Sequence, residues 1–207
     1  MSFSVATLRA FRVYSSASCL QFLLASRELR SMSSRRVLVT GASRGIGAAC
    51  AHRFATAGDA LRLHFRSDPE RAEAVRRALP GTGHEVLQSD LAAPGAPAAL
   101  IEACGPLDVL VVNHGIYEET PVDSTGAAEW TSSFERVLRT NLIAPAELAF
   151  AFGTAARERG TGGAIVFVSS RGAYRGEPLA PAYGASKAAV NSLTGSLAQA
   201  YTAVYLK

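Results

Sequence analysis

The chain has 207 residues, of which 48% are hydrophobic and 18% charged, and this composition excludes a disordered, charge-dominated chain. Residues 1–36 hold six arginines and one acid, so the remainder has 21 − 6 = 15 cations and 17 − 1 = 16 anions. A basic surface for nucleic acid is therefore not expected on the folded body. The three cysteines lack metal-ligand spacing, and no apolar run approaches the ~18 residues of a membrane span.

Residues 1–34 are expected to form a targeting or extension segment without ordered structure. The segment is rich in Ser, Ala and Arg, which is typical of a mitochondrial or other organellar transit peptide. Three apolar side chains fall on one helical face: Val5, Leu8 and Phe11. Two alternatives remain open, a secretory signal around Ala17–Ala25 and a translation start at Met32, which would leave a cytoplasmic protein.

From residue 35 to residue 207, short apolar runs alternate with longer amphipathic stretches. Strands are predicted at Arg36–Thr40, Ala60–Phe65, Glu85–Gln88, Asp108–Asn113 and Ala164–Ser169. Helices are predicted at Gly45–Ala57, Pro69–Leu79, Pro97–Cys104, Phe134–Arg159 and Ala182–Tyr201. Continuously apolar strands alternating with helices indicate a doubly wound parallel α/β sheet, a Rossmann fold with five identifiable strands. Ligands of such folds bind beyond the carboxyl ends of the strands.

A glycine-rich loop, Thr40–Gly47, follows the first of these strands and leads directly into a helix. Glycines at this point permit a tight turn and bring backbone N–H groups and the positive end of the helix close to a pyrophosphate. Glycine clusters are also common in ordinary turns, so the strand before the loop and the helix after it carry the assignment.

The end of the second predicted strand indicates which dinucleotide is bound. A carboxylate there would bind the adenosine ribose and repel a 2′-phosphate, but the segment reads His-Phe-Arg-Ser over residues 64–67. Arg66, together with Arg44 of the glycine loop, is suited to charge-assisted bonds with a phosphate. NADPH is therefore favoured over NADH; the alternative is that both arginines are solvated surface residues.

Tyr183 and Lys187 are four residues apart on a predicted helix and share one of its faces. Lys187 is one of only two lysines in the chain, the other being Lys207. An ammonium group close to a phenol favours loss of the phenol proton, which makes proton transfer to a carbonyl oxygen feasible. A solvated helix face is the alternative for an isolated Tyr/Lys pair, but the position beyond a strand and opposite a nucleotide loop favours chemistry.

From about Arg35 to Tyr201 the chain resembles the short-chain dehydrogenase/reductase family. The TGxxxGxG loop of the family is matched by Thr40, Gly41, Gly45 and Gly47. Further matches are Asp90, Asn113 with Gly115, Asn141, and Ser170 with Ser169 as its alternative. His114 replaces a small residue of the family signature. Residues 43–47 and 66–71 resemble 3-oxoacyl-acyl-carrier-protein reductases in particular.

The resemblance implies roles for individual residues. Tyr183 would act as general acid or base during hydride transfer between nicotinamide and a carbonyl or alcohol substrate, with Lys187 holding the nicotinamide ribose. Ser170 would stabilise the substrate oxygen. Asn141 would hold a water that links Lys187 to solvent. The implied cofactor-binding set is Thr40, Gly41, Ser43, Arg44, Gly45, Ile46, Gly47, Arg66, Asp90, Leu91, Asn113, Gly115, Tyr183 and Lys187.

The family's fold normally continues with two more strands and a substrate-covering segment, for which we find no counterpart. We therefore expect a truncated reductase whose strand at 164–169 is a sheet edge. The function that we expect is NADPH-dependent carbonyl reduction of a small molecule, by a homodimer or homotetramer built on the helices of Asn141 and Tyr183. The alternative is a catalytically weak nucleotide-binding form that associates with a full-length relative. The sequence leaves the substrate and the direction of reaction open.

Overall fold

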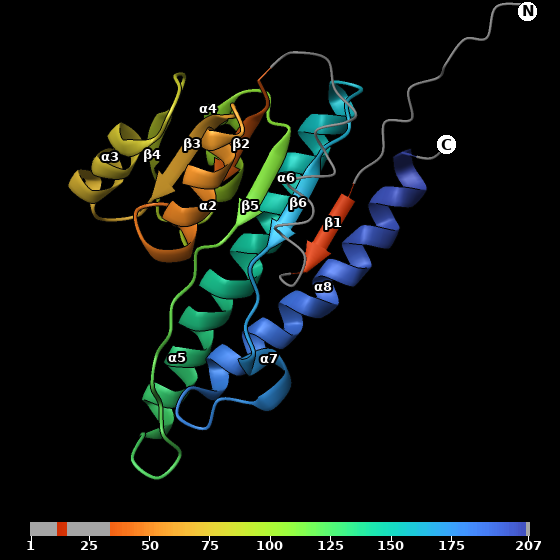
Figure 1. Cartoon of the computed structure of the whole chain (residues 1–207). Helices are drawn as coiled ribbons and strands as arrows, with labels where there is room; N and C mark the ends of the chain where they lie inside the picture. The colour runs from red at the N-terminus through yellow and green to blue at the C-terminus, as the bar shows by residue number, and fades with distance from the viewer. Residues whose placement is uncertain (1–11, 16–33, 206–207) are drawn as a thin grey trace, which may run out of the picture.

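The structure of the protein is a computed structural model that describes residues 12–15 and 34–205 (Figure 1). Its centre is a six-stranded parallel sheet in the order β1-β6-β5-β2-β3-β4. The strands are β1 (Arg12–Ser15), β2 (Arg36–Val39), β3 (Ala60–Phe65), β4 (Glu85–Gln88), β5 (Val109–Val112) and β6 (Ala164–Phe167). All five predicted strands are present within one or two residues of their expected bounds, so the doubly wound parallel fold is confirmed.

Helices connect the strands and cover both faces of the sheet. They are α2 (Gly45–Thr56), α3 (Pro69–Ala78), α4 (Ala96–Cys104), α5 (Ala127–Leu138), α6 (Ala144–Glu158), the short α7 (Gly172–Arg175) and α8 (Pro181–Tyr205). A π-helical turn, η2 (Arg139–Ile143), joins α5 to α6. The helix predicted at 134–159 therefore starts earlier and is not regular throughout. Among the described helices, none combines the length and apolar character needed to cross a membrane.

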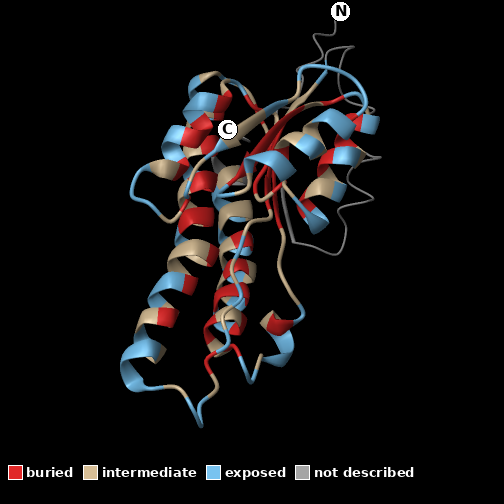
Figure 2. Ribbon diagram, turned by 90° about the vertical axis from the view of Figure 1, so that its left-hand side faces the viewer, coloured by how far each residue is buried: buried red, intermediate tan, exposed pale blue. Residues whose placement is uncertain are grey.

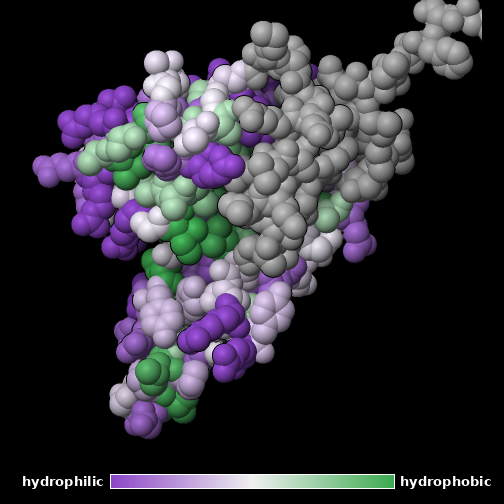
Figure 3. Space-filling model, viewed as in Figure 1, coloured by the Kyte–Doolittle hydropathy of each residue, from purple (hydrophilic) through white to green (hydrophobic). Residues whose placement is uncertain are grey.

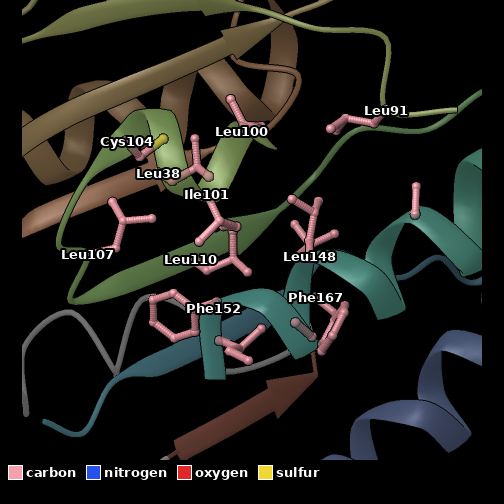
Figure 4. Packing of buried hydrophobic residues seen from close by; sticks show 14 of the residues in the cluster. Leu38, Leu91, Leu100, Ile101, Cys104, Leu107, Leu110, Leu148, Phe152 and Phe167 are labelled. Carbon is pink, nitrogen blue, oxygen red and sulfur yellow. The ribbon is translucent and has the colours of Figure 1, made fainter. Parts of the chain in front are cut away.

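Successive residues of each strand enter two separate cores, as the pleat of a β-strand requires. On one face, Leu38, Leu110 and Phe167 pack with α4, α6 and α8 (Figure 4). On the other face, alternate strand residues such as Val39 pack against α2, where Phe54 is fully buried. Figure 2 shows the buried residues along the strands and on the inward sides of the helices. Burial of a phenylalanine of this kind stabilises the fold by about 2 kcal/mol.

The strand order reverses between β2 and β5. The chain runs outward through β2, β3 and β4 and then returns to β5 on the other side of β2. The carboxyl ends of these two strands diverge into α2 and into the loop before α5, which opens a crevice between them. This geometry places the glycine loop beside the segment that follows β5.

The outer edge of β6 differs from the expectation. Strand β1 pairs with β6 in parallel register, Arg12 opposite Ala164 and Ser15 opposite Phe167, so the prediction that residues 164–169 form a sheet edge is wrong. The unpaired backbone groups of an apolar strand favour such pairing. Part of the segment expected to lack structure is thus a strand. Residues 1–11 and 16–33, which carry most of the targeting prediction, lie outside the described residues.

Candidate active site

The glycine loop is held closed by Asn113, at the end of β5. The Nδ2 atom of Asn113 donates to the backbone oxygens of Thr40, at 3.0 Å, and Gly41, at 3.1 Å. Gly47 must lack a side chain here, because a Cβ would overlap the Gly41 oxygen and lie 2.6 Å from Asn113 Nδ2. At Gly45, where φ is +53°, a Cβ would meet nothing within 4 Å and would project into open space. The loop thus presents bare backbone to the adjoining crevice.

A cavity of about 460 Å³ lies in this crevice, over the carboxyl ends of β2 to β5. Ten predicted cofactor residues line it: Gly41, Ser43, Arg44, Gly45, Ile46, Arg66, Asp90, Leu91, Asn113 and Gly115. The other four do not line it. Thr40 and Gly47 belong to the glycine loop but do not face the cavity, and Tyr183 and Lys187 lie on α8. Lining residues outside the predicted set include His64, Arg71, Ser89, His114, Ile116 and Thr140.

His64 and His114 form a pair behind the glycine loop, with ring centroids 6.2 Å apart. The Nδ1 atom of His64 accepts from the Gly41 N–H at 3.2 Å, so its Nε2 carries the proton and donates to the Ser89 oxygen at 2.9 Å. Burial lowers the pKa of His64. This histidine therefore ties the glycine loop to the end of β4 in its neutral form, a contact that no sequence motif indicates.

His114 occupies the place of the small residue in the family signature. Its Nδ1 lies 2.8 Å from the hydroxyl oxygen of Thr40, which also accepts from the backbone N–H groups of Asn113 and His114. Burial, with smaller effects of His64 and Lys187, lowers the pKa of His114 to about 3. A neutral ring thus fills the space under the loop without displacing its backbone.

The end of the cavity near β3 is rich in arginine. Arg44, Arg66 and Arg71 all line it, and the backbone oxygen of Arg66 accepts from Gln88 Nε2 at 3.0 Å. Asp68, the nearest carboxylate along the chain, caps α3: it accepts from the Arg71 N–H at 2.9 Å and pairs with the Arg71 side chain at 3.5 Å. Asp68 also lines the cavity, so this end holds three arginines and one carboxylate that Arg71 already pairs. This end of the cavity is suited to an anion.

Lys187 is almost completely buried, with 5% of its surface exposed, and its Nζ donates to the Val168 oxygen at 2.9 Å. Burial lowers the pKa of Lys187 to about 8. The Nζ atom lies over the Tyr183 ring, 5.8 Å from its centroid. A Cβ at Gly115 would lie 3.7 Å from this Nζ, so the wall of the cofactor cavity directly adjoins the lysine. Tyr183 and Lys187 thus lie together on one face of α8, as their spacing predicts, and Lys187 adjoins the cavity.

Asn141 is buried in the π-helical turn and holds the loop that follows β5. Its Oδ1 accepts from the Ile116 N–H at 2.8 Å, while its Nδ2 donates to the Ile116 oxygen at 2.9 Å and to Ser186 Oγ at 3.2 Å. Single π-turns inside helices often occur at functional sites. The side chain therefore joins three elements: η2, α8 and the cavity wall.

The two candidate serines after β6 point to different partners. Ser170 Oγ accepts from the Gly172 N–H at 3.1 Å, which leaves its own proton available for donation. Ser169 Oγ instead donates to the Lys187 backbone oxygen at 3.5 Å. Of the two, Ser170 has the hydroxyl that is suited to a substrate oxygen.

Nothing in the described part of the chain gathers three or more metal-ligand side chains. Burial raises the pKa of the Cys104 thiol to about 12, which keeps it protonated and unreactive.

A glycine loop at a strand-order reversal, next to Tyr183 and the buried Lys187, defines a Rossmann-type dinucleotide-binding domain. The family model described as short chain dehydrogenase matches residues 35–204. The chain belongs to this family.

Relatives and solved structures agree with this assignment. The chain is 33% identical over 173 residues to galactitol 2-dehydrogenase of Agrobacterium fabrum, covering 82% of this chain and 65% of that one. It is 34% identical over 171 residues to the 3-oxoacyl-[acyl-carrier-protein] reductase FabG of Aggregatibacter actinomycetemcomitans, covering 80% and 69%. A crystal structure of 3-oxoacyl (acyl-carrier-protein) reductase from Agrobacterium tumefaciens C58 with NADP bound superposes with a TM-score of 0.73 at 30% identity, covering 83% and 66%. The chain thus spans less than two thirds of the galactitol 2-dehydrogenase.

Proposed function

We propose that the protein is an NADPH-dependent oxidoreductase that transfers a hydride between the nicotinamide and a small carbonyl or alcohol substrate. The observation that carries the proposal is the contact between the cofactor cavity and the buried lysine: Gly115 lines the cavity, and a Cβ at this glycine would lie 3.7 Å from Lys187 Nζ. A cofactor in this cavity would therefore place its reactive end beside the Tyr183 helix.

The residues present fit a dinucleotide. Bare backbone at Gly45 and the start of α2 offer N–H groups and the positive end of a helix to a pyrophosphate. Asp90 and Leu91 line the cavity at the end of β4, where an adenine would lie. The nicotinamide, when bound, supplies or accepts the hydride.

The preference for NADPH rests on charge at the end of β3. Three arginines, at positions 44, 66 and 71, line the cavity there. The carboxylate of Asp68 also lines the cavity, but it accepts from the Arg71 N–H at the start of α3 and pairs with the Arg71 side chain. A 2′-phosphate would therefore gain charge-assisted hydrogen bonds at an end of the cavity that has three arginines and one carboxylate, which Arg71 already pairs. The NADP-bound reductase from Agrobacterium tumefaciens described above supports the same choice.

The roles of the residues in reduction follow from their positions. Tyr183 gives its phenol proton to the carbonyl oxygen as the hydride reaches the carbonyl carbon, and takes a proton in the reverse direction. Lys187, when charged, stabilises the phenolate that remains and restores the proton. Ser170 donates its free hydroxyl proton to the developing oxyanion.

Asn141 acts as a positioning residue with a proposed link to water. Both protons of its Nδ2 are engaged by Ile116 and Ser186. A water connecting Lys187 to solvent would therefore bind Asn141 through Oδ1 or its backbone oxygen. The amide meanwhile fixes the backbone of the cavity wall next to Gly115.

Steady-state NADPH oxidation with a β-ketoacyl thioester and with a quinone tests the proposal. Tyr183→Phe is expected to abolish turnover while NADPH binding, followed by fluorescence titration, changes little.

Ser170→Ala should lower kcat strongly, and Ser169→Ala serves as the matched control, whose kcat should stay unchanged. Full activity of Tyr183→Phe would refute the mechanism. Cofactor binding without turnover in the unaltered chain would favour the alternative, a catalytically weak form that acts with a full-length relative.

We also propose self-association through the helices that carry Asn141 and Tyr183. Two large apolar side chains on η2 and α6 are exposed, Ile143 at 43% and Phe150 at 71%. Burying them would stabilise a dimer or tetramer. Sedimentation velocity of the chain and of Phe150→Asp tests this, since a monomer in both samples would contradict it.

A further inference from the structure

Tyr117 stands directly against the proposed proton donor. Its ring packs edge-on to the ring of Tyr183, with centroids 5.0 Å apart and an interplanar angle of 64°. Half of its surface, 50%, remains exposed. The side chain of Asn141 forms hydrogen bonds with both the backbone N–H and the backbone oxygen of the preceding residue, Ile116. The tyrosine is therefore held at a fixed place beside the reacting group while one side of its ring stays open.

Two segments around this ring carry exposed apolar side chains. One segment lies between β5 and α5, and the other lies between β6 and α8 and contains α7. A hydrogen bond from the Thr120 N–H to the Leu179 oxygen, at 2.7 Å, joins them. Among the described residues, four of the seven large hydrophobic side chains that are exposed belong to these segments: Tyr117, Val122, Tyr174 and Leu179. In Figure 3, apolar surface is visible at the end of the molecule that holds the loop before α5. Exposed apolar groups gathered beside a reactive centre indicate a binding surface.

Burial and the neighbouring charges favour the neutral form of the Tyr117 phenol. Partial burial, followed by the carboxylates of Glu177 and Glu119 and by Tyr183, raises the pKa of Tyr117, against a smaller opposing effect of Arg171. Tyr117 is therefore not a second proton-transfer group at neutral pH. It is an uncharged aromatic surface next to two carboxylates, which disfavour an anionic substrate group at this point.

We propose that Tyr117 is a specificity-determining residue, which forms an aromatic wall of the carbonyl site and selects substrates with an aromatic ring next to the reacting carbonyl. Aromatic rings prefer edge-to-face or offset contacts with one another, and the open side of the Tyr117 ring offers such a contact. A flexible alkyl chain gains no comparable geometry. The proposal rests on the oxidoreductase function and names the substrate class of the same site.

Two ketones of equal carbon number, acetophenone and 2-octanone, provide the test. Their binding to the full chain with NADP⁺ is measured by saturation-transfer NMR, and their reduction with NADPH is measured in parallel. Tyr117→Ala is compared with Tyr117→Phe, which keeps the ring. Acetophenone binding is expected to weaken about 5- to 10-fold in Tyr117→Ala and to stay unchanged in Tyr117→Phe, with 2-octanone unaffected by either.

The outcomes separate this proposal from the one on which it rests. Equal loss for both ketones, no loss in Tyr117→Ala, or no acetophenone binding by the unaltered chain would overturn the role of Tyr117. Turnover that persists in that case leaves the oxidoreductase function intact. Ring-dependent binding without any turnover would instead support the role of Tyr117 as a binding residue and contradict the oxidoreductase function.

Discussion

The ammonium nitrogen of Lys187 lies over the ring of Tyr183, 5.8 Å from its centroid. The same nitrogen donates to a backbone oxygen after β6 and is nearly shielded from solvent. Lys187 is buried with no carboxylate partner among the described residues, which makes its charged form costly and lowers its pKa to about 8. The proposed proton relay thus has a lysine that changes charge close to physiological pH.

This pKa can be measured on the intact protein, because the chain has only two lysines, Lys187 and Lys207. With ¹³C-labelled lysine, one ε-carbon resonance is expected to titrate near pH 8, below the ordinary lysine value of ~10.4. Lys187→Arg should remove the resonance that titrates lower and so assign it. Two resonances that both titrate above pH 10 would contradict the burial of an uncompensated ammonium.

Arg44, in the glycine loop, and Arg66, at the end of β3, should decide between the two cofactors. Replacing Arg44 and Arg66 together by Ala is expected to weaken NADPH binding by roughly 100-fold or more, since each charge-assisted hydrogen bond contributes roughly 1.5–3 kcal/mol and about 1.4 kcal/mol is tenfold. NADH binding should change little. Arg157→Ala, an exposed arginine at the end of α6, is the control. Equal losses for both cofactors, measured by calorimetry, would show that the arginines do not contact a 2′-phosphate.

Strand β1 should protect the backbone of β6. Successive N–H groups of a strand point to opposite sides, so only one of Val13→Pro and Tyr14→Pro removes a donor directed at β6. Hydrogen exchange of residues 164–167 is expected to accelerate in that variant and to stay slow in the other. Unchanged protection in both variants would mean that β1 does not hold this edge in solution.

His114 should make the fold sensitive to acid. Its pKa is lowered from 6.5 to about 3 by burial, so between these values the unfolded chain binds a proton that the folded chain does not. The free energy of unfolding therefore falls as pH drops below 6.5. In urea unfolding at pH 7 and pH 5, His114→Ala should lose less stability on acidification than the unaltered protein. An identical loss would exclude His114 as a cause.

Most of the sheet could be predicted because continuous apolar runs between amphipathic stretches have few other interpretations. Phosphate-loop residues such as Gly45 were predictable for a similar reason, since strand, glycine loop and helix follow one another along the chain. Asn113 and Gly115 at the cavity follow from the family signature. In each case the signal is local in the sequence or lies in an ordered motif.

The features that escaped prediction depend on contacts between distant segments. Strand β1 has only four residues, Arg12–Ser15, and pairs with residues about 150 positions away, so the local sequence does not predict it. The His64–His114 contact arises only once β3 and β5 stand on either side of β2. Tyr117 is an isolated loop tyrosine whose place against Tyr183 becomes visible only in three dimensions.

Transfer of a deuteride tests the central claim most directly. The full chain is incubated with NADPH deuterated at the transferring position of C4 and with a carbonyl substrate, and the alcohol is analysed by mass spectrometry. One deuterium on the carbinol carbon, with no product from Tyr183→Phe, is the result that we predict. Unlabelled alcohol, or labelled alcohol formed equally by Tyr183→Phe, would contradict hydride transfer with Tyr183 as the proton donor.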